Sequence, residues 1–332
     1  MTEIRKHPVT KKRVIIAVER NGRPSDLIKS EYKSDKEDFV ETCPFCPGNE
    51  EDTPKEIMRF TKKNDWKVRV VPNKYSALSM KSKCKDDNSE LFNKKNGLGF
   101  HEVIIEGRKH NSNYFNMNKE DFIYILHMHR ERYKDLMMRK GIEYVSIYKN
   151  YQKKAGASLE HTHSQMIASP FIPSLIEEEL ISSKEYFDSK GSCIYCDILK
   201  EEIDKKERIV IESENFIVLT PFASMYNYEI SIFPKSHQSS FIEMSIKEVR
   251  ELAGLLEKIF KKMGNLLGEF PFNMFLHNAP LLKKEYDNSY HWHIGITPRF
   301  STQAGFELGS GIYINTISPE DAAKTLRNIK GV

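Results

Sequence analysis

The sequence predicts an α+β protein in which antiparallel sheets and helices form two similar halves. A chain of 332 residues is long enough for two units of roughly 150 residues each. Strand-like segments occur in runs with helical segments between them, which favours antiparallel sheets over a series of parallel βαβ units. A set of cysteines and histidines also occurs twice in the same order, which indicates an internal duplication.

The expected strands are segments rich in β-branched and aromatic residues. One group of them lies at residues 13–19, 66–73, 101–107, 143–150 and 161–169. A second group lies at residues 208–213, 216–222, 228–235, 272–280 and 291–299. The lysine-rich stretch 81–99, which contains Cys84, is expected to be an exposed loop with no assigned role.

The expected helices have apolar residues at helical spacing. The segment 118–141 places Phe122 and Ile125 in this way and begins with acidic residues, and the segment 247–268 ends in glycine. A further helix is expected to begin at Ser318, because a serine N-cap, a proline and two acids follow one another there.

The composition indicates a globular protein, with 39% hydrophobic and 30% charged residues. No apolar run approaches the roughly 18 residues that a membrane span needs. The net charge of +4 is a weak bias, and the cysteine pairs do not lie in basic stretches interleaved with aromatic residues. We therefore expect a cytoplasmic protein that binds neither membranes nor nucleic acid.

Two Cys-x-x-Cys pairs, each followed by separated histidines, have the donor types of tetrahedral zinc sites. The alternatives are a redox pair or buried thiols beside unrelated histidines. The duplicated order favours a structural zinc site in each half. The candidate ligands in the first half are Cys43, Cys46 and His110 with one histidine of the pair His161 and His163. Those in the second half are Cys193, Cys196 and His237 with one histidine of the pair His291 and His293. The repeat assigns no role to His7, His101, His127, His129 or His277.

The segment "HTHSQ" combines this metal chemistry with a second histidine. On a strand, His161 and His163 would project in parallel about 6–7 Å apart, which suits one metal-bound imidazole beside a free one. A neutral imidazole can attack phosphorus and form a phosphoramidate. We therefore predict that one histidine of the pair is a nucleophile, with Gln165 and Ser158 as donors to the phosphoryl oxygens. A purely structural His163 is the alternative.

The second half carries the related segment "HWHIG", which contains His291 and His293. Gly295 stands where the first half has Gln165, so the second half is predicted to be a structural copy without the same chemistry. We place the boundary between the halves near Lys190 and Gly191.

The segment "NYQKKAGASLEHTHSQ" resembles the active-site segment of the galactose-1-phosphate uridylyltransferase family, a branch of the histidine-triad superfamily. Two departures from the family pattern are Tyr151-Gln152, where Lys-Gly is usual, and Thr162, where proline is usual. The residues at matching offsets are Asn150, Gly156, Ser158, His161, His163 and Gln165.

This resemblance covers almost the whole chain and implies two histidine-triad-like half-barrels, residues 1–190 and 191–332, in a homodimer. It implies that His163 is the nucleophile and that Cys43, Cys46, His110 and His161 hold zinc. It also implies the remaining contacts with substrate, made by Arg20, Arg23, Asn73, Tyr75, Asn150, Gly156 and Ala157, with Phe306 and Glu307 shaping the pocket for the sugar or acceptor.

The implied reaction moves a nucleoside monophosphate between a UDP-hexose and a hexose 1-phosphate by a ping-pong mechanism. An ADP-glucose phosphorylase that uses inorganic phosphate is the alternative, because Tyr313-Ile314-Asn315 and the second cysteine pair resemble that subgroup. The ligands of the second metal site stay open, since Glu179, His277 and His293 also resemble a family metal site. An inactive, zinc-stabilised nucleotide-binding protein is a further alternative.

Overall fold

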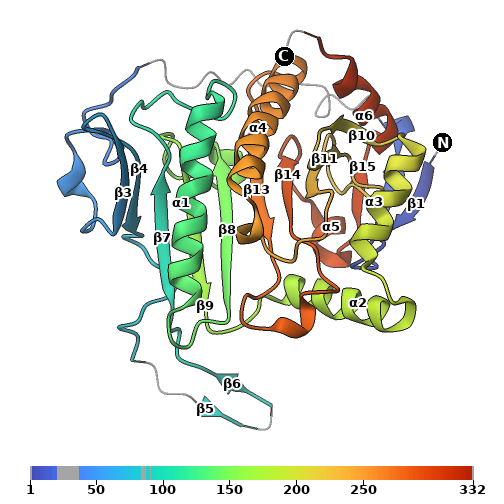
Figure 1. Cartoon of the computed structure of the whole chain (residues 1–332), viewed down its shortest axis with the longest axis horizontal. Helices are drawn as coiled ribbons and strands as arrows, with labels where there is room; N and C mark the ends of the chain where they lie inside the picture. The colour runs from blue at the N-terminus through green and yellow to red at the C-terminus, as the bar shows by residue number, and fades with distance from the viewer. Residues whose placement is uncertain (1, 21–36, 84–86, 90, 331–332) are drawn as a thin grey trace.

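A computed structural model of the chain describes residues 2–20, 37–83, 87–89 and 91–330 (Figure 1). Arg23 and Cys84 lie outside the described residues. The protein has the predicted α+β class: helices cover a ten-stranded sheet with the strand order β10-β11-β12-β14-β13-β8-β9-β7-β4-β3. Neighbouring strands in this sheet are antiparallel throughout.

The two halves of the sheet have the same topology. The first half consists of β3 (Met58–Lys62), β4 (Asp65–Pro72), β7 (Phe100–Ile105), β8 (Tyr144–Tyr151) and β9 (His163–Ser169). The second half consists of β10 (Ile209–Glu212), β11 (Phe216–Leu219), β12 (Ile230–Pro234), β13 (Phe272–His277) and β14 (His293–Pro298). In each half the last two strands lie in the sheet in the reverse of their sequence order, so β9 lies between β7 and β8, and β14 lies between β12 and β13. The two halves meet where β8 pairs with β13. This repeated order supports the predicted duplication, while the boundary near Gly191 stays a prediction.

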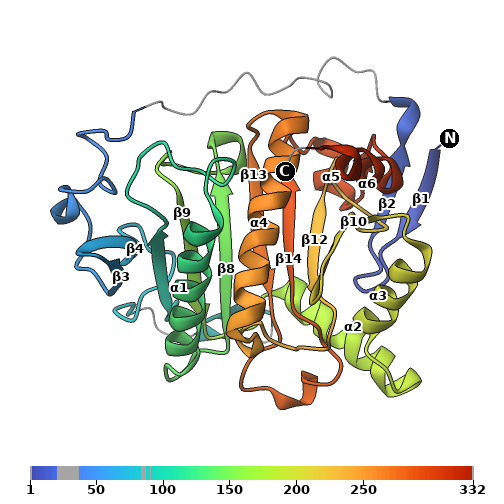
Figure 2. The same ribbon diagram turned by 45° about the horizontal axis from the view of Figure 1, so that its top comes forward.

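Two long helices cover one face of the sheet, one over each half (Figures 1 and 2). They are α1 (Lys119–Met137) and α4 (Ile246–Leu267), and both begin with a capping box, at Asn118 and Ser245. The helix predicted at Ser318 is also confirmed: α6 (Pro319–Asn328) begins there, and the Ser318 side chain accepts a hydrogen bond from the Asp321 amide.

Several elements were not predicted. They are the helices α2 (Ser174–Lys190), α3 (Ile194–Lys205) and α5 (Gly305–Ser310), the strand β3, the hairpin β5 (Asp87–Asn88) and β6 (Asn93–Lys94), and the strands β1 (Thr2–Lys6) and β15 (Tyr313–Asn315). The last two form a small sheet with β2 (Arg13–Ala17), which confirms the strand predicted at residues 13–19. Short 3-10 turns are η1 (Val18–Arg20), η2 (Glu50–Asp52), η3 (Lys153–Ala155), η4 (Phe241–Glu243) and η5 (Lys284–Tyr286). The small sheet joins opposite ends of the sequence, because β2 pairs in parallel with β15.

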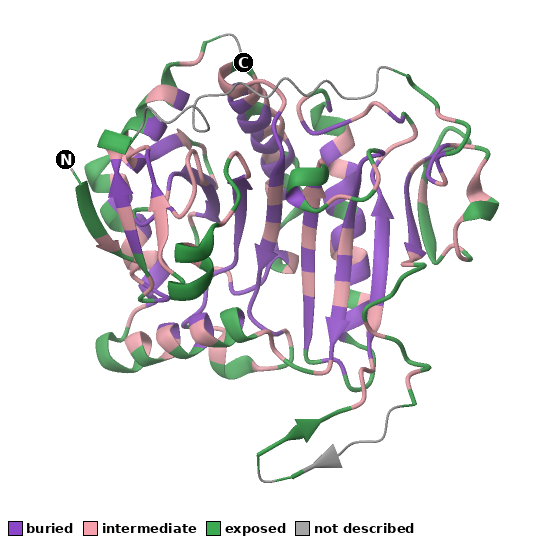
Figure 3. Ribbon diagram, turned by 180° about the vertical axis from the view of Figure 1, so that it is seen from behind, coloured by how far each residue is buried: buried purple, intermediate pink, exposed green. Residues whose placement is uncertain are grey.

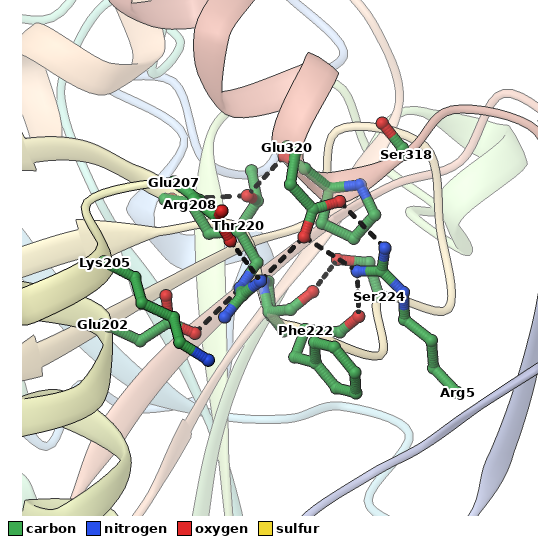
Figure 4. Close-up of polar contacts among 12 residues, drawn as sticks. Arg5, Glu202, Lys205, Glu207, Arg208, Thr220, Phe222, Ser224, Ser318 and Glu320 are labelled. Carbon is green, nitrogen blue, oxygen red and sulfur yellow. Dashed lines mark hydrogen bonds and ion pairs between the residues drawn. The ribbon is translucent and has the colours of Figure 1, made fainter.

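An ion-pair network fastens β1 to α6 (Figure 4). Arg5 donates through both terminal nitrogens to the Glu320 carboxylate, at 2.9 Å each, and Arg208 donates to the same carboxylate at 2.7 Å. The Arg5 guanidinium also lies 4.6 Å from the centre of the Phe222 ring. Residues 2–6 are therefore attached to the second half of the molecule, although they begin the sequence.

The face of the sheet opposite α1 and α4 is uncovered over much of the first half, where its strands alternate buried and half-buried residues (Figure 3). This face presents the side chains that form the candidate site. Among the described helices, none is both long and apolar enough to cross a membrane.

Candidate active site and metal clusters

The first cysteine pair lies in a turn and faces two histidines from distant parts of the chain. The donor atoms of Cys43, Cys46, His110 and His161 lie within 4.8 Å of one another, and all four residues are buried. The sulfur-to-nitrogen distances are 3.5–3.7 Å. Zinc bound tetrahedrally by thiolate and imidazole would separate such atoms by about 3.5 Å. The donor set and its spacing therefore fit zinc.

His161 reaches this cluster because it is not part of the strand. The prediction that a strand begins at residue 161 was wrong: β9 begins at His163, and His161 lies in the preceding bend. Its Nε2 donates to the Gly107 carbonyl at 2.9 Å, which leaves Nδ1 directed at Cys43 and Cys46. A carbonyl partner of this kind fixes the tautomer and orientation of a metal-binding imidazole.

The second cluster repeats this arrangement with Cys193, Cys196, His237 and His291. Cys196 Sγ lies 3.4 Å from His237 Nδ1 and 3.6 Å from His291 Nδ1. His291 Nε2 donates to the Pro234 carbonyl at 3.0 Å, as His161 does to Gly107. His291 also lies before its predicted strand, since β14 begins at His293. This cysteine pair stands at the start of α3, yet Cys196 faces the two imidazoles.

The sequence leaves open which residues form the second metal site. In the structure the two histidines of "HWHIG" belong to different clusters. His291 joins the cysteines, whereas His293 lies with Glu179 and His277 in a third buried group whose donor atoms are within 4.8 Å of one another. In that group Glu179 pairs with His277 at 3.1 Å and accepts a hydrogen bond from Tyr290 at 2.7 Å.

His163 opens onto a cavity of about 640 Å³ on the uncovered face of the sheet. Its Nδ1 lies 2.8 Å from the His161 carbonyl and must donate to it, so Nε2 keeps a lone pair. Burial is the main cause that lowers the pKa of His163, which favours the neutral ring. The Phe45 ring lies edge-on, with 5.5 Å between the two ring centres. A buried neutral imidazole with a free Nε2 can act as a nucleophile.

The cavity gathers some of the predicted residues. Ser158, Gln165, Asn73 and Tyr75 line it together with His163. Walls that the sequence did not predict are Thr42, Pro44, Phe45, Glu51, Asp52, Thr53, Pro54, Val71, Pro72, Lys74, Val103 and Leu159. Pro44 and Phe45 lie between Cys43 and Cys46. Their place inside the Cys-x-x-Cys motif is the one feature of the sequence that could have identified them as pocket residues.

Other predicted residues lie beside or away from this cavity. Gly156 has a φ of +90°, which glycine adopts easily, and the Ala157 amide donates to the Gln152 carbonyl at 3.1 Å. Asn150 accepts a hydrogen bond from Asn273 at 2.8 Å where the two halves meet. Arg20 is exposed at the end of η1. Phe306 and Glu307 are in α5 and are not among the residues that line the cavity.

A buried polar network supports the strand that carries His163. The Lys149 ammonium donates to the His163 carbonyl at 2.9 Å, to Thr162 Oγ1 at 2.8 Å and to Glu106 at 2.5 Å. Burial alone would raise the pKa of Glu106, but the Lys149 charge holds it below its usual value. Thr162, which departs from the family pattern, thus supplies a hydroxyl that proline could not.

The corresponding place in the second half is filled by an aromatic ring. A Cβ atom added at Gly295 would lie 2.2 Å from Phe275 Cζ, so no glutamine fits where Gln165 stands in the first half. His293 itself is enclosed by Phe233 and Tyr195, with ring centres 5.1 Å and 5.6 Å away. The second histidine of the repeat therefore packs against aromatic rings and has a glycine at the position that corresponds to Gln165.

Two family models match the sequence. The model described as galactose-1-phosphate uridyl transferase, N-terminal domain, matches residues 1–173. A model described as a domain of unknown function (DUF4921) matches residues 99–329.

Curated relatives match over nearly the full length. An ADP-glucose phosphorylase from Arabidopsis thaliana is 35% identical over 331 residues, which cover 98% of this chain and 93% of the relative. A galactose-1-phosphate uridylyltransferase from Thermotoga maritima is 30% identical over 335 residues, which cover 98% of each chain.

Solved structures of an ADP-glucose phosphorylase and a uridylyltransferase are also similar over nearly the whole chain. The crystal structure of the Arabidopsis thaliana ADP-glucose phosphorylase with bound ADP-glucose has a TM-score of 0.83, 31% identity and 99% coverage of both chains. A structure described as uridylyltransferase has a TM-score of 0.76 and 26% identity, and the match covers 98% of this chain and 97% of that one.

Proposed function

Because the chain belongs to the galactose-1-phosphate uridylyltransferase family, we propose that it moves a nucleoside monophosphate between a UDP-hexose and a hexose 1-phosphate through a covalent histidine intermediate. It is a nucleotidyltransferase, as its curated relatives are. The observation that carries the mechanism is the His163 ring, which is held neutral with Nε2 open to the cavity.

In the first step, Nε2 of His163 attacks the α-phosphorus of the nucleotide sugar. The new N–P bond replaces the bond to the bridging oxygen, which leaves with the electron pair as part of the sugar 1-phosphate. Gln165 and Ser158 line the same cavity and stabilise the charge on the phosphoryl oxygens. In the second step, a phosphate oxygen of the acceptor attacks the same phosphorus and restores the free imidazole.

The substrate contacts follow the family pattern. Asn73 and Tyr75 bind the nucleoside, and the loop with Gly156 and Ala157 approaches the α-phosphate beside Asn150. Arg20 and Arg23 contact the distal phosphate or sugar, and Phe306 and Glu307 in α5 shape the acceptor pocket. Phe306 is exposed and does not line the cavity of its own chain. In the proposed homodimer, α5 would therefore shape the acceptor pocket of the partner chain.

Both Cys2His2 clusters hold zinc in this proposal, and the metal has a structural role. Thiolates and imidazoles complete a tetrahedral shell at each cluster, which leaves no open position for substrate. At the first cluster, zinc ties the turn that contains Phe45 to the segment just before β9. Residues 1–190 then form the unit with the nucleophile, and residues 191–332 form its structural counterpart in a cytoplasmic enzyme.

An ADP-glucose phosphorylase that uses inorganic phosphate is the second candidate. The similarity to the Arabidopsis thaliana enzyme and the paired cysteines of the second cluster favour it. The two candidates share the first half-reaction and differ in the acceptor of the second.

Isotope exchange tests the shared step and the acceptor together. With UDP-glucose and labelled glucose 1-phosphate alone, label should enter UDP-glucose, because a covalent intermediate allows this exchange without a second substrate. The same mixture with galactose 1-phosphate or with inorganic phosphate then identifies the acceptor, and a parallel series uses ADP-glucose. Absence of exchange with either nucleotide sugar would contradict the proposal.

A further inference from the structure

His101 has no counterpart in the repeated metal ligands, yet it lies directly behind the cavity. It stands on β7, next to the strand that carries His163 and Gln165, and only 9% of its surface is exposed. Its Nε2 is 2.8 Å from Gln165 Oε1. The residue therefore contacts a side chain of the cavity wall without lining the cavity itself.

The tautomer of His101 follows from its other nitrogen. The Ala77 backbone amide lies 3.2 Å from His101 Nδ1, and because an amide can only donate, Nδ1 is the acceptor. In a neutral ring the proton is then on Nε2, which donates to Gln165 Oε1. Burial lowers the pKa of His101 and so favours this neutral form.

Two further donors converge on the same oxygen. Asn73 Oδ1 accepts from the Tyr75 amide at 2.8 Å, so the amino group of Asn73 faces Gln165 Oε1, at 3.2 Å. The Tyr148 hydroxyl donates to Gln165 Oε1 at 3.3 Å. If the Gln165 amide were reversed, its NH2 group would face the Nε2–H of His101 and the NH2 group of Asn73, neither of which can accept a hydrogen bond. The Gln165 amide is therefore held with its oxygen toward β7, and its NH2 group is the end that can donate into the cavity.

We propose that His101 is a positioning residue that fixes Gln165 as a hydrogen-bond donor to the phosphoryl group transferred to His163. This inference rests on the proposed function, because it requires a phosphoryl group beside Gln165. A glutamine that rotated freely would present its oxygen to the phosphate part of the time, and two electronegative groups would then repel each other. The contact from His101 removes that orientation before substrate binds.

The test measures the single-turnover rate at which UDP-glucose or ADP-glucose forms the covalent adduct. His101→Leu should slow this step by about ten- to a hundred-fold, by analogy with the loss of an outer-shell residue that orients a metal ligand. His101→Gln, which keeps an NH donor near the Nε2 position, should recover much of the rate. His127→Leu is the matched control, since His127 is exposed on α1, and it should leave the rate unchanged.

A double-mutant cycle separates positioning from general structural support. In a Gln165→Met background there is no amide to orient, so His101→Leu should change the rate by less than about two-fold. Zinc content and thermal midpoint are measured for each variant, and His101→Gln keeps the comparison usable if His101→Leu does not fold. Equal rates for wild type and His101→Leu, failure of His101→Gln to exceed His101→Leu, or an additive cycle would overturn the inference. A wild-type protein that forms no adduct would instead overturn the proposed function.

Discussion

The proton on His163 is held by a carbonyl two residues earlier in the same chain. His293 makes the corresponding contact with the His291 carbonyl, at 3.3 Å, so the histidine alone does not distinguish the two halves. The difference lies two residues later, where Gln165 faces a cavity and Gly295 faces the Phe275 ring. At the scale of single residues, the residue two positions after the histidine is therefore what distinguishes the proposed active half from its structural copy.

The Lys149 and Glu106 pair gives a prediction about stability. Both side chains are buried, and Lys149→Met would leave Glu106 with its hydrogen bonds from Tyr114 and Thr162 but without the opposite charge of Lys149. We expect the free energy of unfolding in urea to fall by roughly 3–5 kcal/mol. Lys149→Met combined with Glu106→Gln should recover part of this loss. Lys184→Met, which breaks an exposed pair with Asp188, is the control and should change stability by less than about 1 kcal/mol. Equal effects of the two lysine substitutions would contradict the prediction.

Glu229 gives a prediction about pH. Its carboxylate accepts from the Met225 and Tyr226 amides, and burial raises its pKa from 4.5 to about 7. Between these values the folded protein keeps a proton that the unfolded chain has released, so the free energy of unfolding falls as pH rises from about 5 to 8. Because the residue is only half-buried, we expect a change on the order of 1 kcal/mol. In urea unfolding, the free energy of unfolding of Glu229→Gln should fall less than that of the wild type between about pH 5 and 8. An identical fall in both proteins would contradict a raised pKa of Glu229.

At the scale of elements, the turn around the first cysteine pair has two roles. Cys43 and Cys46 face the histidines of the first cluster, while Phe45 between them contacts His163 and lines the cavity. A structural metal there would affect the cavity directly. The second cluster differs, because none of Cys193, Cys196, His237 and His291 is among the residues that line the cavity.

This difference predicts unequal effects of removing each metal. Elemental analysis of the wild type should find about two zinc ions per chain, one for each Cys2His2 cluster. Cys43→Ala should lose one zinc ion together with most adduct formation, whereas Cys196→Ala should lose one zinc ion and still form the adduct. A wild type with fewer than two zinc ions, or a Cys196→Ala variant as inactive as Cys43→Ala, would contradict the proposed roles.

The sequence predicts most strands and the two long helices because their apolar periodicity is local. It misplaces His161 and His291, since alternation of residues suggests a strand while the hydrogen bonds to Gly107 and Pro234 turn each ring toward a metal cluster. It also misses α2 and α3. A bend stabilised by a carbonyl from a distant segment of the chain has no local signature.

At the scale of the whole molecule, segments far apart in the sequence lie side by side in the small sheet. Residues 2–6 are held on the second half through Arg5 and Glu320, and β2 pairs with β15. Pairing between Val14 and Tyr313 depends on almost the entire intervening chain, and no periodicity predicts it. The duplication was predictable because ligand types recur in order. The donors around Gln165 were not, because His101, Asn73 and Tyr148 come from three separate strands or loops.

The ion pairs of Glu320 predict how this attachment fails. Glu320→Ala would leave Arg5 and Arg208 without their shared carboxylate, and we expect stability to fall by roughly 1–3 kcal/mol. Backbone amides of β1 should exchange hydrogen faster, because their attachment to α6 is lost. Glu3→Ala removes the other, more exposed partner of Arg5 and should have a smaller effect on both measurements. Unchanged exchange in β1 of Glu320→Ala would contradict this role.

The central claim is that His163 carries the nucleotide, and the mass of the intact protein tests it most directly. After incubation with UDP-glucose or ADP-glucose, the wild type should gain the mass of one UMP or AMP group, and His163→Asn should gain none while retaining the same zinc content. An unmodified wild type with every nucleotide sugar, or an adduct that persists in His163→Asn, would contradict the covalent mechanism. Loss of zinc from His163→Asn would instead identify His163 as a metal ligand.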